Sequence, residues 1–132
     1  AFENVEVPLL FANVIARKRR ERVVEVLNRV GLGDKLANKP TEMSGGEMQR
    51  VAIARALANE PEIILADEPT GNLDTKSGAD IFSLFRELHS AGKTIIIITH
   101  DVNLARQTER ILKLKDGLVD TNGNGSAAPQ PH

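Results

Sequence analysis

The chain has 132 residues, of which 41% are hydrophobic and 27% are charged, the composition of an ordinary globular protein. Its 17 Lys and Arg residues against 18 Asp and Glu residues give a formal net charge of −1, which excludes a global attraction to nucleic acid or anionic lipid. The sequence contains no cysteine, so a disulfide scaffold and a thiolate metal site are also excluded. Its longest aliphatic run, Ile95 to Ile98, is far shorter than the roughly 20 residues of a membrane-spanning helix.

The first part of the chain is predicted to be helical. A first helix is favoured around Pro8 by the apolar residues Val5, Val7, Leu9, Leu10 and Phe11. Residues 15–30 predict a second helix, because their apolar side chains follow helical spacing and a glycine stops the pattern. This helix opens with a basic run at residues 17–22. The run is interpreted as a solvated helical face in the first place, with an anion or partner site as the alternative.

A glycine-rich turn precedes the third predicted helix, which runs from about Glu47 to Asn59. In this turn Ser44, Gly45 and Gly46 bring several backbone amides to a helix start, where the helix dipole and the small side chains favour a phosphate. A second interpretation is a plain capping box, formed by Ser44 and by Glu47 three residues later. The two interpretations are compatible, because a capped helix start still presents amides.

The second part of the chain alternates strand and helix, which predicts the α/β class with a parallel sheet. The unbroken β-branched pattern of residues 94–98 further predicts a strand that is buried on both faces. Residues 121–132 are Asn, Gly, Ser, Ala and Pro with few other types, and predict a disordered tail. The predicted elements are a strand at 63–66, a helix at 77–90, a strand at 94–98, a short helix at 103–108 and a hairpin at 111–119 with an Asp-Gly turn.

Polar side chains follow both predicted strands, at the edge where open parallel sheets carry their chemistry. Asp67 and Glu68 follow the first strand, and His100 follows the second. In extended backbone the two carboxylates face opposite ways, so that one can hold Mg²⁺ while the other polarises a water molecule. The alternative is a structural one, in which the carboxylates cap the next element and the histidine is a structural side chain.

The order and spacing of these segments resemble those of a known family. Residues 43–57 (MSGGEMQRVAIARAL) resemble the signature motif and following helix of ABC-type ATPases, and residues 63–70 (IILADEPT) look like their Walker B strand. Residues 71–74 are similar to the D-loop and residues 99–101 to the switch histidine. Within the family, the stretches ENVEVPLL and ADEPTGNLD look most like the lipoprotein-release and macrolide-export branch.

The resemblance implies a dimer of two nucleotide-binding domains arranged head to tail around two ATP molecules. Ser44, Gly45 and Gly46 would contact the γ-phosphate of the ATP that the other subunit holds, and Asp74 would couple the two sites. Glu47 stands where the family commonly has Gln, and adds a negative charge near the phosphate.

The resemblance also implies the chemistry of hydrolysis and the setting of the protein. Asp67 would bind Mg²⁺ through water, Glu68 would act as the general base, and His100 would contact the γ-phosphate. Hydrolysis would drive a transmembrane permease subunit, contacted through the helical subdomain. The implied location is cytoplasmic, peripheral on the inner face of the cell membrane, with no nucleic-acid partner.

One motif of the family does not occur in these 132 residues: the phosphate loop G-x-x-x-x-G-K-[ST]. We therefore expect the C-terminal part of a P-loop NTPase domain, inactive by itself and prone to associate with itself through exposed strands. The expected division is a helical subdomain at 1–60, part of the α/β catalytic core at 61–120 and the tail at 121–132. Two alternatives remain open, a non-catalytic binding or regulatory module and an ABC ATPase of the DNA-repair type.

Overall fold

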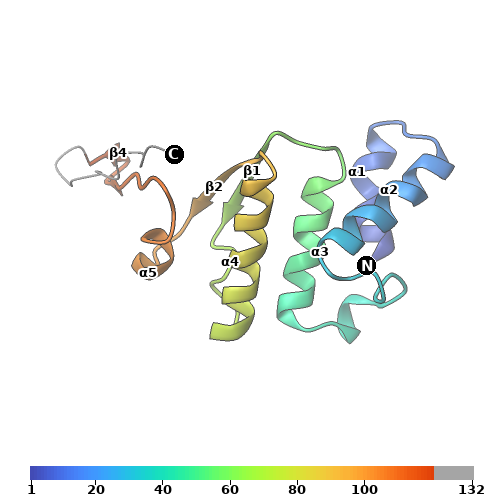
Figure 1. The fold of residues 1–132 in the computed structure, drawn as a ribbon, viewed down its shortest axis with the longest axis horizontal. Coiled ribbons are helices and arrows are strands. Elements are labelled where there is room, and N and C mark those ends of the chain that lie inside the picture. The colour runs from blue at the N-terminus through green and yellow to red at the C-terminus, as the bar shows by residue number, and fades with distance from the viewer. Residues whose placement is uncertain (121–132) are drawn as a thin grey trace. The chain divides into compact units, whose positions relative to one another are not determined.

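The computed structural model describes residues 1–120, which fall into two compact units (Figure 1). The first unit is Ala1–Ile98, and the second begins at Thr99. The predicted disordered tail at 121–132 lies outside the described residues. Among the described residues, no helix is long and apolar enough to cross a membrane.

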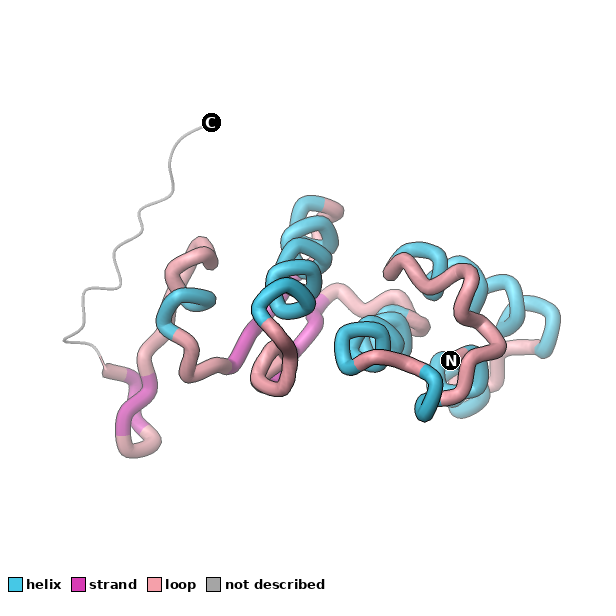
Figure 2. Tube along the Cα trace, turned by 90° about the horizontal axis from the view of Figure 1, so that it is seen from below, coloured by secondary structure: helices cyan, strands magenta, loops and turns pink. Residues whose placement is uncertain are grey.

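Three helices that lie side by side open the first unit (Figures 1 and 2). They are α1 (Phe2–Phe11), α2 (Ala16–Arg29) and α3 (Gly45–Leu57), with a short 3₁₀ helix η1 (Pro40–Glu42) before α3. The predicted first and second helices are confirmed, whereas α3 begins two residues earlier than predicted because Ser44 is its N-cap. The residues buried between them are apolar and include Val5, Val23, Val26, Leu27, Ala54 and Leu57.

A β–α–β unit follows, and it confirms the predicted parallel α/β arrangement. Strand β1 (Ile63–Asp67) pairs in parallel with β2 (Thr94–Ile98), and helix α4 (Thr75–Ser90) forms the connection. Helix α4 packs against the sheet with one apolar face, which consists of Ile81, Phe82, Leu84, Phe85 and Leu88. Because β1 and β2 are in register from Ile63 with Thr94 to Asp67 with Ile98, their carboxyl ends lie next to each other.

The prediction that β2 is buried on both faces is wrong for the residues that the structure describes. The exposure of side chains alternates along both strands, so that one face of the sheet is covered and the other is not. The uncovered face carries the exposed side chains Ile63, Leu65, Ile96 and Ile98. An unbroken apolar strand is typical of a sheet with helices on both faces. Within residues 1–98 only α4 covers a face of this sheet, so every second apolar side chain of the strands is exposed to solvent.

The second unit is small. Helix α5 (Val102–Ala105) is shorter than predicted, and it begins at Asp101, whose carboxylate accepts from the amides of Asn103 and Leu104. Strands β3 (Leu114–Lys115) and β4 (Leu118–Val119) form the predicted antiparallel hairpin. The turn residues Asp116 and Gly117 have φ of 50° and 77°, the backbone that an Asp-Gly hairpin turn requires.

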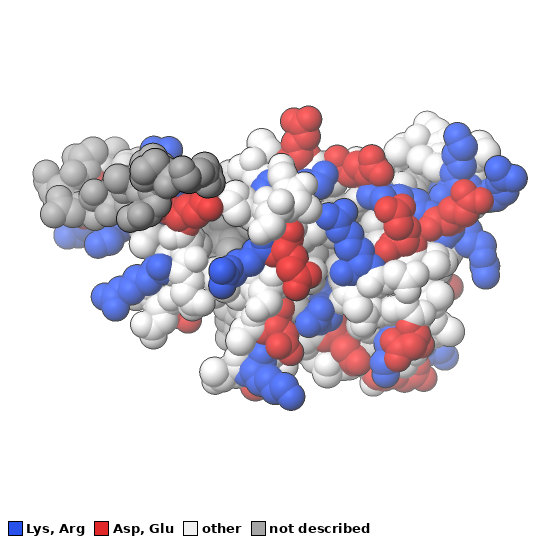
Figure 3. All heavy atoms as spheres, in the orientation of Figure 1, with Lys and Arg blue, Asp and Glu red and all other residues white. Residues whose placement is uncertain are grey.

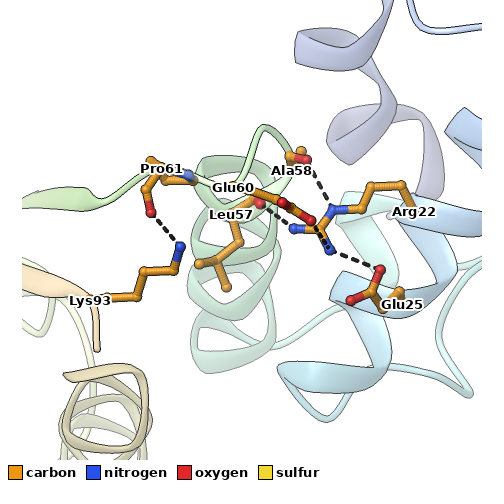
Figure 4. Close-up of polar contacts among 7 residues, drawn as sticks. All are labelled: Arg22, Glu25, Leu57, Ala58, Glu60, Pro61 and Lys93. Carbon is orange, nitrogen blue, oxygen red and sulfur yellow. Dashed lines mark hydrogen bonds and ion pairs between the residues drawn. The ribbon is translucent and has the colours of Figure 1, made fainter. Parts of the chain in front are cut away.

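The connection between α3 and β1 is held by two cations from different parts of the first unit (Figure 4). From α2, the Arg22 guanidinium donates to the carbonyl oxygens of Leu57 at 2.9 Å and Ala58 at 3.0 Å. Its second amino group pairs with Glu25 at 2.8 Å and Glu60 at 3.2 Å. These carbonyl groups lie at the C-terminal end of α3, where carbonyl oxygens have no hydrogen-bond donor within the helix. An arginine from another helix, Arg22 of α2, thus caps the C-terminal end of α3.

On the other side, the Lys93 ammonium group donates to the carbonyl oxygen of Pro61 at 2.6 Å, just before β1 (Figure 4). The amide of Thr94 donates to the carbonyl oxygen of Glu62 at 2.8 Å. The connection is therefore tied to α2 at its start and to the beginning of β2 at its end.

We expect Arg22→Met to lower the free energy of unfolding by about 2 kcal/mol, because the Ala58 carbonyl oxygen loses this donor and the Leu57 carbonyl oxygen keeps only the amide of Glu60. Chemical denaturation followed by circular dichroism measures the change. Arg17→Met in the same helix is the matched control. The Arg17 side chain is 84% exposed against 16% for Arg22, and its ion pair with Glu21 lies on the surface, so a change below about 0.5 kcal/mol is expected. Equal losses in both variants would contradict the role given to Arg22.

We also expect the chain to associate with itself through the uncovered sheet face. Leu65→Lys combined with Ile96→Lys places two charges at one cross-strand pair, and this should reduce the association seen by sedimentation velocity. Leu114→Lys is the control, since the Leu114 side chain is more exposed than those of Leu65 and Ile96 but lies in the hairpin of the second unit. A monomer at all concentrations in the unmodified chain would refute the expectation.

Candidate functional site

The turn from Ser44 to Glu47 forms the predicted capping box at the start of α3. The Glu47 amide donates to Ser44 Oγ at 3.2 Å, and the Ser44 amide donates to the Glu47 carboxylate at 2.8 Å. The amides of Gly45 and Gly46 lie in the first helical turn, where amides have no intrahelical acceptor. The turn therefore combines a satisfied cap with two amides at the positive end of the helix dipole.

The two glycines of this turn also have a packing role that sequence reasoning missed. A Cβ atom on Gly46 would lie 3.2 Å from Ser77 Cβ, and one on Gly45 would lie 3.3 Å from a methyl group of Leu73. The start of α3 thus approaches the loop before α4 and the first turn of α4 closely. A side chain at either position would require Leu73 or Ser77 to shift by a few tenths of an ångström, whether or not a phosphate binds there.

Asp74 is the N-cap of α4. Its carboxylate accepts from the Ser77 amide at 3.0 Å and from the Ser77 hydroxyl at 2.6 Å. The Ser77 side chain lies next to Gly46 at the start of α3. The carboxylate of Asp74 therefore orients a side chain that packs against the start of α3. The pattern Asp-x-x-Ser before an apolar helix is a signal that could have found Ser77.

Hydrogen bonds lower the pKa of two carboxyl groups at these helix starts. The pKa of Asp74 lies below its usual range because the hydroxyl and the amide of Ser77 donate to the ionised form. The pKa of Glu47 is lowered by the amide of Ser44, and the nearby Lys35 ammonium group, 3.7 Å away, lowers it further. Both side chains act as caps in their ionised form.

At the end of β1 the chain turns sharply, and the two carboxylates differ in their surroundings. Asp67 is exposed and is the last strand residue, whereas Glu68 is half-buried and has a φ of +44°. The predicted alternation of side chains in extended backbone therefore does not extend to Glu68. Its amide donates to the carbonyl oxygen of Ile98 at 2.8 Å, which fixes this unusual backbone at the sheet edge. Left-handed backbone at a residue other than glycine is costly and is concentrated at functional sites.

The structure brings some of the predicted site residues together. Glu68 and Gly45 line one hollow of about 410 Å³ between α3 and the loop after β1, together with Met43, Asn72 and Leu73. Gly46 and Asp74 meet through Ser77. His100 lies two residues beyond β2 and belongs to the second unit.

The carboxylates do not form a metal cage. Among residues 1–120, no group of three or more His, Cys, Asp or Glu side chains is close enough to hold a metal ion. A single carboxylate together with substrate phosphates is one way in which proteins bind Mg²⁺.

An α/β framework with a glycine-rich helix start beside strand-end carboxylates is typical of nucleotide-binding proteins. The family model described as ABC transporter matches residues 1–71. The chain is 52% identical over 120 residues to an ABC transporter ATP-binding protein of Thermotoga maritima, covering 91% of the chain and 51% of the relative. It is also 52% identical over 130 residues to the ABC transporter ATP-binding protein YvrO of Bacillus subtilis, covering 97% of the chain and 57% of YvrO. The chain belongs to the ABC transporter ATP-binding family.

The finer resemblance and the fold are confirmed as well. The macrolide export ATP-binding/permease protein MacB of a Shewanella strain is 48% identical over 130 residues, which are 98% of this chain and 20% of MacB. The dimeric ATP-binding cassette MJ0796, solved with ADP and Pi, matches 90% of this chain and 53% of its own with a TM-score of 0.74 and 51% identity. The chain thus spans about half the length of the ATP-binding relatives it matches.

We expect part of the acid sensitivity of this chain to come from Asp74. Because its pKa is lower in the folded state, its contribution to stability is complete above about pH 4 and is lost as the pH falls through the lowered value. Asp74→Asn should therefore flatten the dependence of the melting temperature on pH in this acid range. Asp80→Asn, at an exposed position in α4, is the control and should leave the pH profile unchanged. Identical profiles for Asp74→Asn and the unmodified chain would contradict the assignment.

Proposed function

We propose that this chain is the C-terminal part of the ATP-binding and ATP-hydrolysing subunit of an ABC transporter. The observation that carries the proposal is the placement of Glu68 at the sheet edge, where its backbone has a φ of +44° and its amide donates to the carbonyl oxygen of Ile98 at 2.8 Å. The family membership and the cassette fold support it. The proposed division is a helical subdomain at 1–60 and part of the catalytic core at 61–120.

In this proposal two subunits pair head to tail around two ATP molecules. The amides of Gly45 and Gly46, with the hydroxyl of Ser44, bind the γ-phosphate of the ATP held by the other subunit. Glu47 keeps the helix start closed through the capping box, and its charge moderates the affinity for the phosphate. Asp74 couples the two sites, and its hydrogen bonds to Ser77 give it a link to the turn that binds phosphate. The dimer of the cassette MJ0796 supports this arrangement.

Glu68 is the proposed general base. ATP with Mg²⁺ supplies a terminal phosphoryl group that water can attack, and Asp67 is suited to hold the cation through water. The carboxylate of Glu68 orients and deprotonates the water, and the fixed backbone at φ +44° keeps it at the sheet edge. His100 is proposed to contact the γ-phosphate. The ADP and Pi in the related cassette support ATP as the substrate.

The proposed partner is a transmembrane permease, which the helical subdomain contacts from the inner face of the cell membrane. The MacB relatives support it, since their name combines an ATP-binding and a permease function. The balanced charge of the chain and the transporter relatives argue against a nucleic-acid partner and against the DNA-repair type of ABC ATPase.

A second candidate is a non-catalytic binding or regulatory module. One observation favours it: the motif G-x-x-x-x-G-K-[ST] does not occur in these 132 residues, and this loop is what holds the β- and γ-phosphates in such enzymes. The same observation leads to the expectation that the chain by itself does not hydrolyse ATP.

A chimera tests the two candidates. The part of YvrO that precedes its match to this chain is joined to residue 1, and ATP hydrolysis is measured by phosphate release. We expect the chimera to hydrolyse ATP, the chain alone to be inactive, and Glu68→Gln in the chimera to lower the rate about 10²- to 10⁴-fold while ATP binding is retained. Glu62→Gln, an exposed glutamate before β1, is the matched control and should keep the rate.

Three results would count against the proposal. Hydrolysis by the chain alone, abolished by Glu68→Gln, would show that the chain needs no further part. A chimera that binds ATP but never hydrolyses it would favour the non-catalytic module. Equal effects of Glu62→Gln and Glu68→Gln would remove Glu68 from its proposed role.

A further inference from the structure

The turn between α1 and α2 exposes a group of large apolar side chains that no part of the first unit covers. Phe11 is 85% exposed, Ile15 62%, Leu10 48% and Val7 43%. Val7 and Phe11 are one helical turn apart on α1, and Ile15 is the N-cap residue of α2. We call residues 7–15 the apolar tip. Single exposed apolar residues are normal, but four within nine residues form a patch.

The apolar tip is an ordered structure rather than a loose loop. The amides of Asn13 and Val14 donate to the carbonyl oxygens of Leu10 at 3.0 Å and Leu9 at 3.1 Å. Arg19 donates to the carbonyl oxygen of Val14 at 2.8 Å and to the Glu6 carboxylate at 2.9 Å, which ties the turn to both helices. The fold therefore holds Phe11 and Ile15 outward, because the turn that carries them is fixed by hydrogen bonds.

The charged residues that follow the apolar tip along the chain are mostly basic. No acidic residue occurs between Glu6 and Glu21, whereas Arg17, Lys18, Arg19 and Arg20 follow the tip directly. In Figure 3, Lys and Arg side chains lie at the end of the first unit that α1 and α2 form, with Asp and Glu side chains among them. Arg17 and Lys18 are exposed, and the pair of Arg17 with Glu21 at 3.6 Å is a surface contact. The chain as a whole is nearly neutral, so this basic fringe is a local feature.

We propose that the apolar tip binds an anionic phospholipid surface, with Phe11 and Ile15 inserted at the level of the headgroups and Arg17 and Lys18 on the lipid phosphates. A basic run by itself is usually a solvated helix face. Here apolar side chains protrude directly beside it, and peripheral membrane binding generally needs both of these contributions. An exposed prong such as Phe11 suits a deformable lipid interface, which needs no preformed matching hollow.

This inference goes beyond the proposed ATPase and is tested without nucleotide, so the two proposals fail independently. The full 132-residue chain is sedimented with vesicles of mixed phosphatidylglycerol and phosphatidylcholine, and with vesicles of phosphatidylcholine alone. We expect binding to the anionic vesicles, weaker binding to the neutral ones, and a loss of binding as salt is added.

Two sets of variants separate the contributions. Phe11→Ser and Ile15→Ser should each weaken binding to the anionic vesicles by roughly tenfold. Arg17→Gln and Lys18→Gln should each weaken it about fivefold and reduce the salt dependence. These side chains are exposed, and circular dichroism confirms that the helices remain.

Matched substitutions in the second unit are the controls. Leu112→Ser removes an apolar side chain that is 66% exposed, and Lys113→Gln removes an exposed cation beside it. Both should leave vesicle binding unchanged.

Equal losses in the control and tip variants, or equal binding to neutral and anionic vesicles, would overturn the proposal. It would also be overturned if the tip variants bound vesicles normally but lost binding to an acidic amphipathic peptide, since the tip would then be a protein-binding surface.

Discussion

The first unit depends on how helix α3 is held at its two ends. At the C-terminal end, Arg22 from α2 supplies donors to carbonyl oxygens that the helix cannot satisfy itself. At the N-terminal end, Gly46 lets the helix rest on Ser77, which the carboxylate of Asp74 orients. Because α3 begins at the signature turn and leads into β1, these two contacts decide how the turn lies relative to the sheet edge. The hollow shared by Gly45 and Glu68 follows from that placement.

Structural and functional roles overlap at this site. Ser44 and Asp74 are N-caps, and each uses its side-chain oxygen on a backbone amide three residues later. The same two residues are proposed to act on phosphate and on coupling between subunits. A helix start carries unpaired amides and a positive dipole end, so it suits both a carboxylate cap and a bound anion. Loss of activity on substitution at these positions therefore has to be separated from loss of the cap, and this is why measurements of stability and of hydrolysis belong together.

Two apolar surfaces of the first unit have different physical characters. The uncovered sheet face is a flat array of β-branched and leucine side chains such as Leu65 and Ile96, which matches another apolar layer. The apolar tip around Phe11 protrudes and is bordered by Arg17 and Lys18, which matches a surface that is apolar inside and anionic outside. The first surface favours protein packing, and the second favours a lipid interface.

The sequence by itself determined the features that depend on neighbours along the chain. Helical spacing, the Ser44 cap, the Asp116-Gly117 turn and the order of the motifs gave the α/β class and the family, because each is set within a few residues. Only the tertiary structure decided which sheet face is uncovered, that Gly46 packs on Ser77, that Arg22 closes α3, and that Glu68 leaves extended backbone. Each of these features joins residues that are distant in sequence or depends on the neighbouring strand. The hydrogen bond from the Glu68 amide to the Ile98 carbonyl oxygen is an example, and no local sequence pattern encodes it.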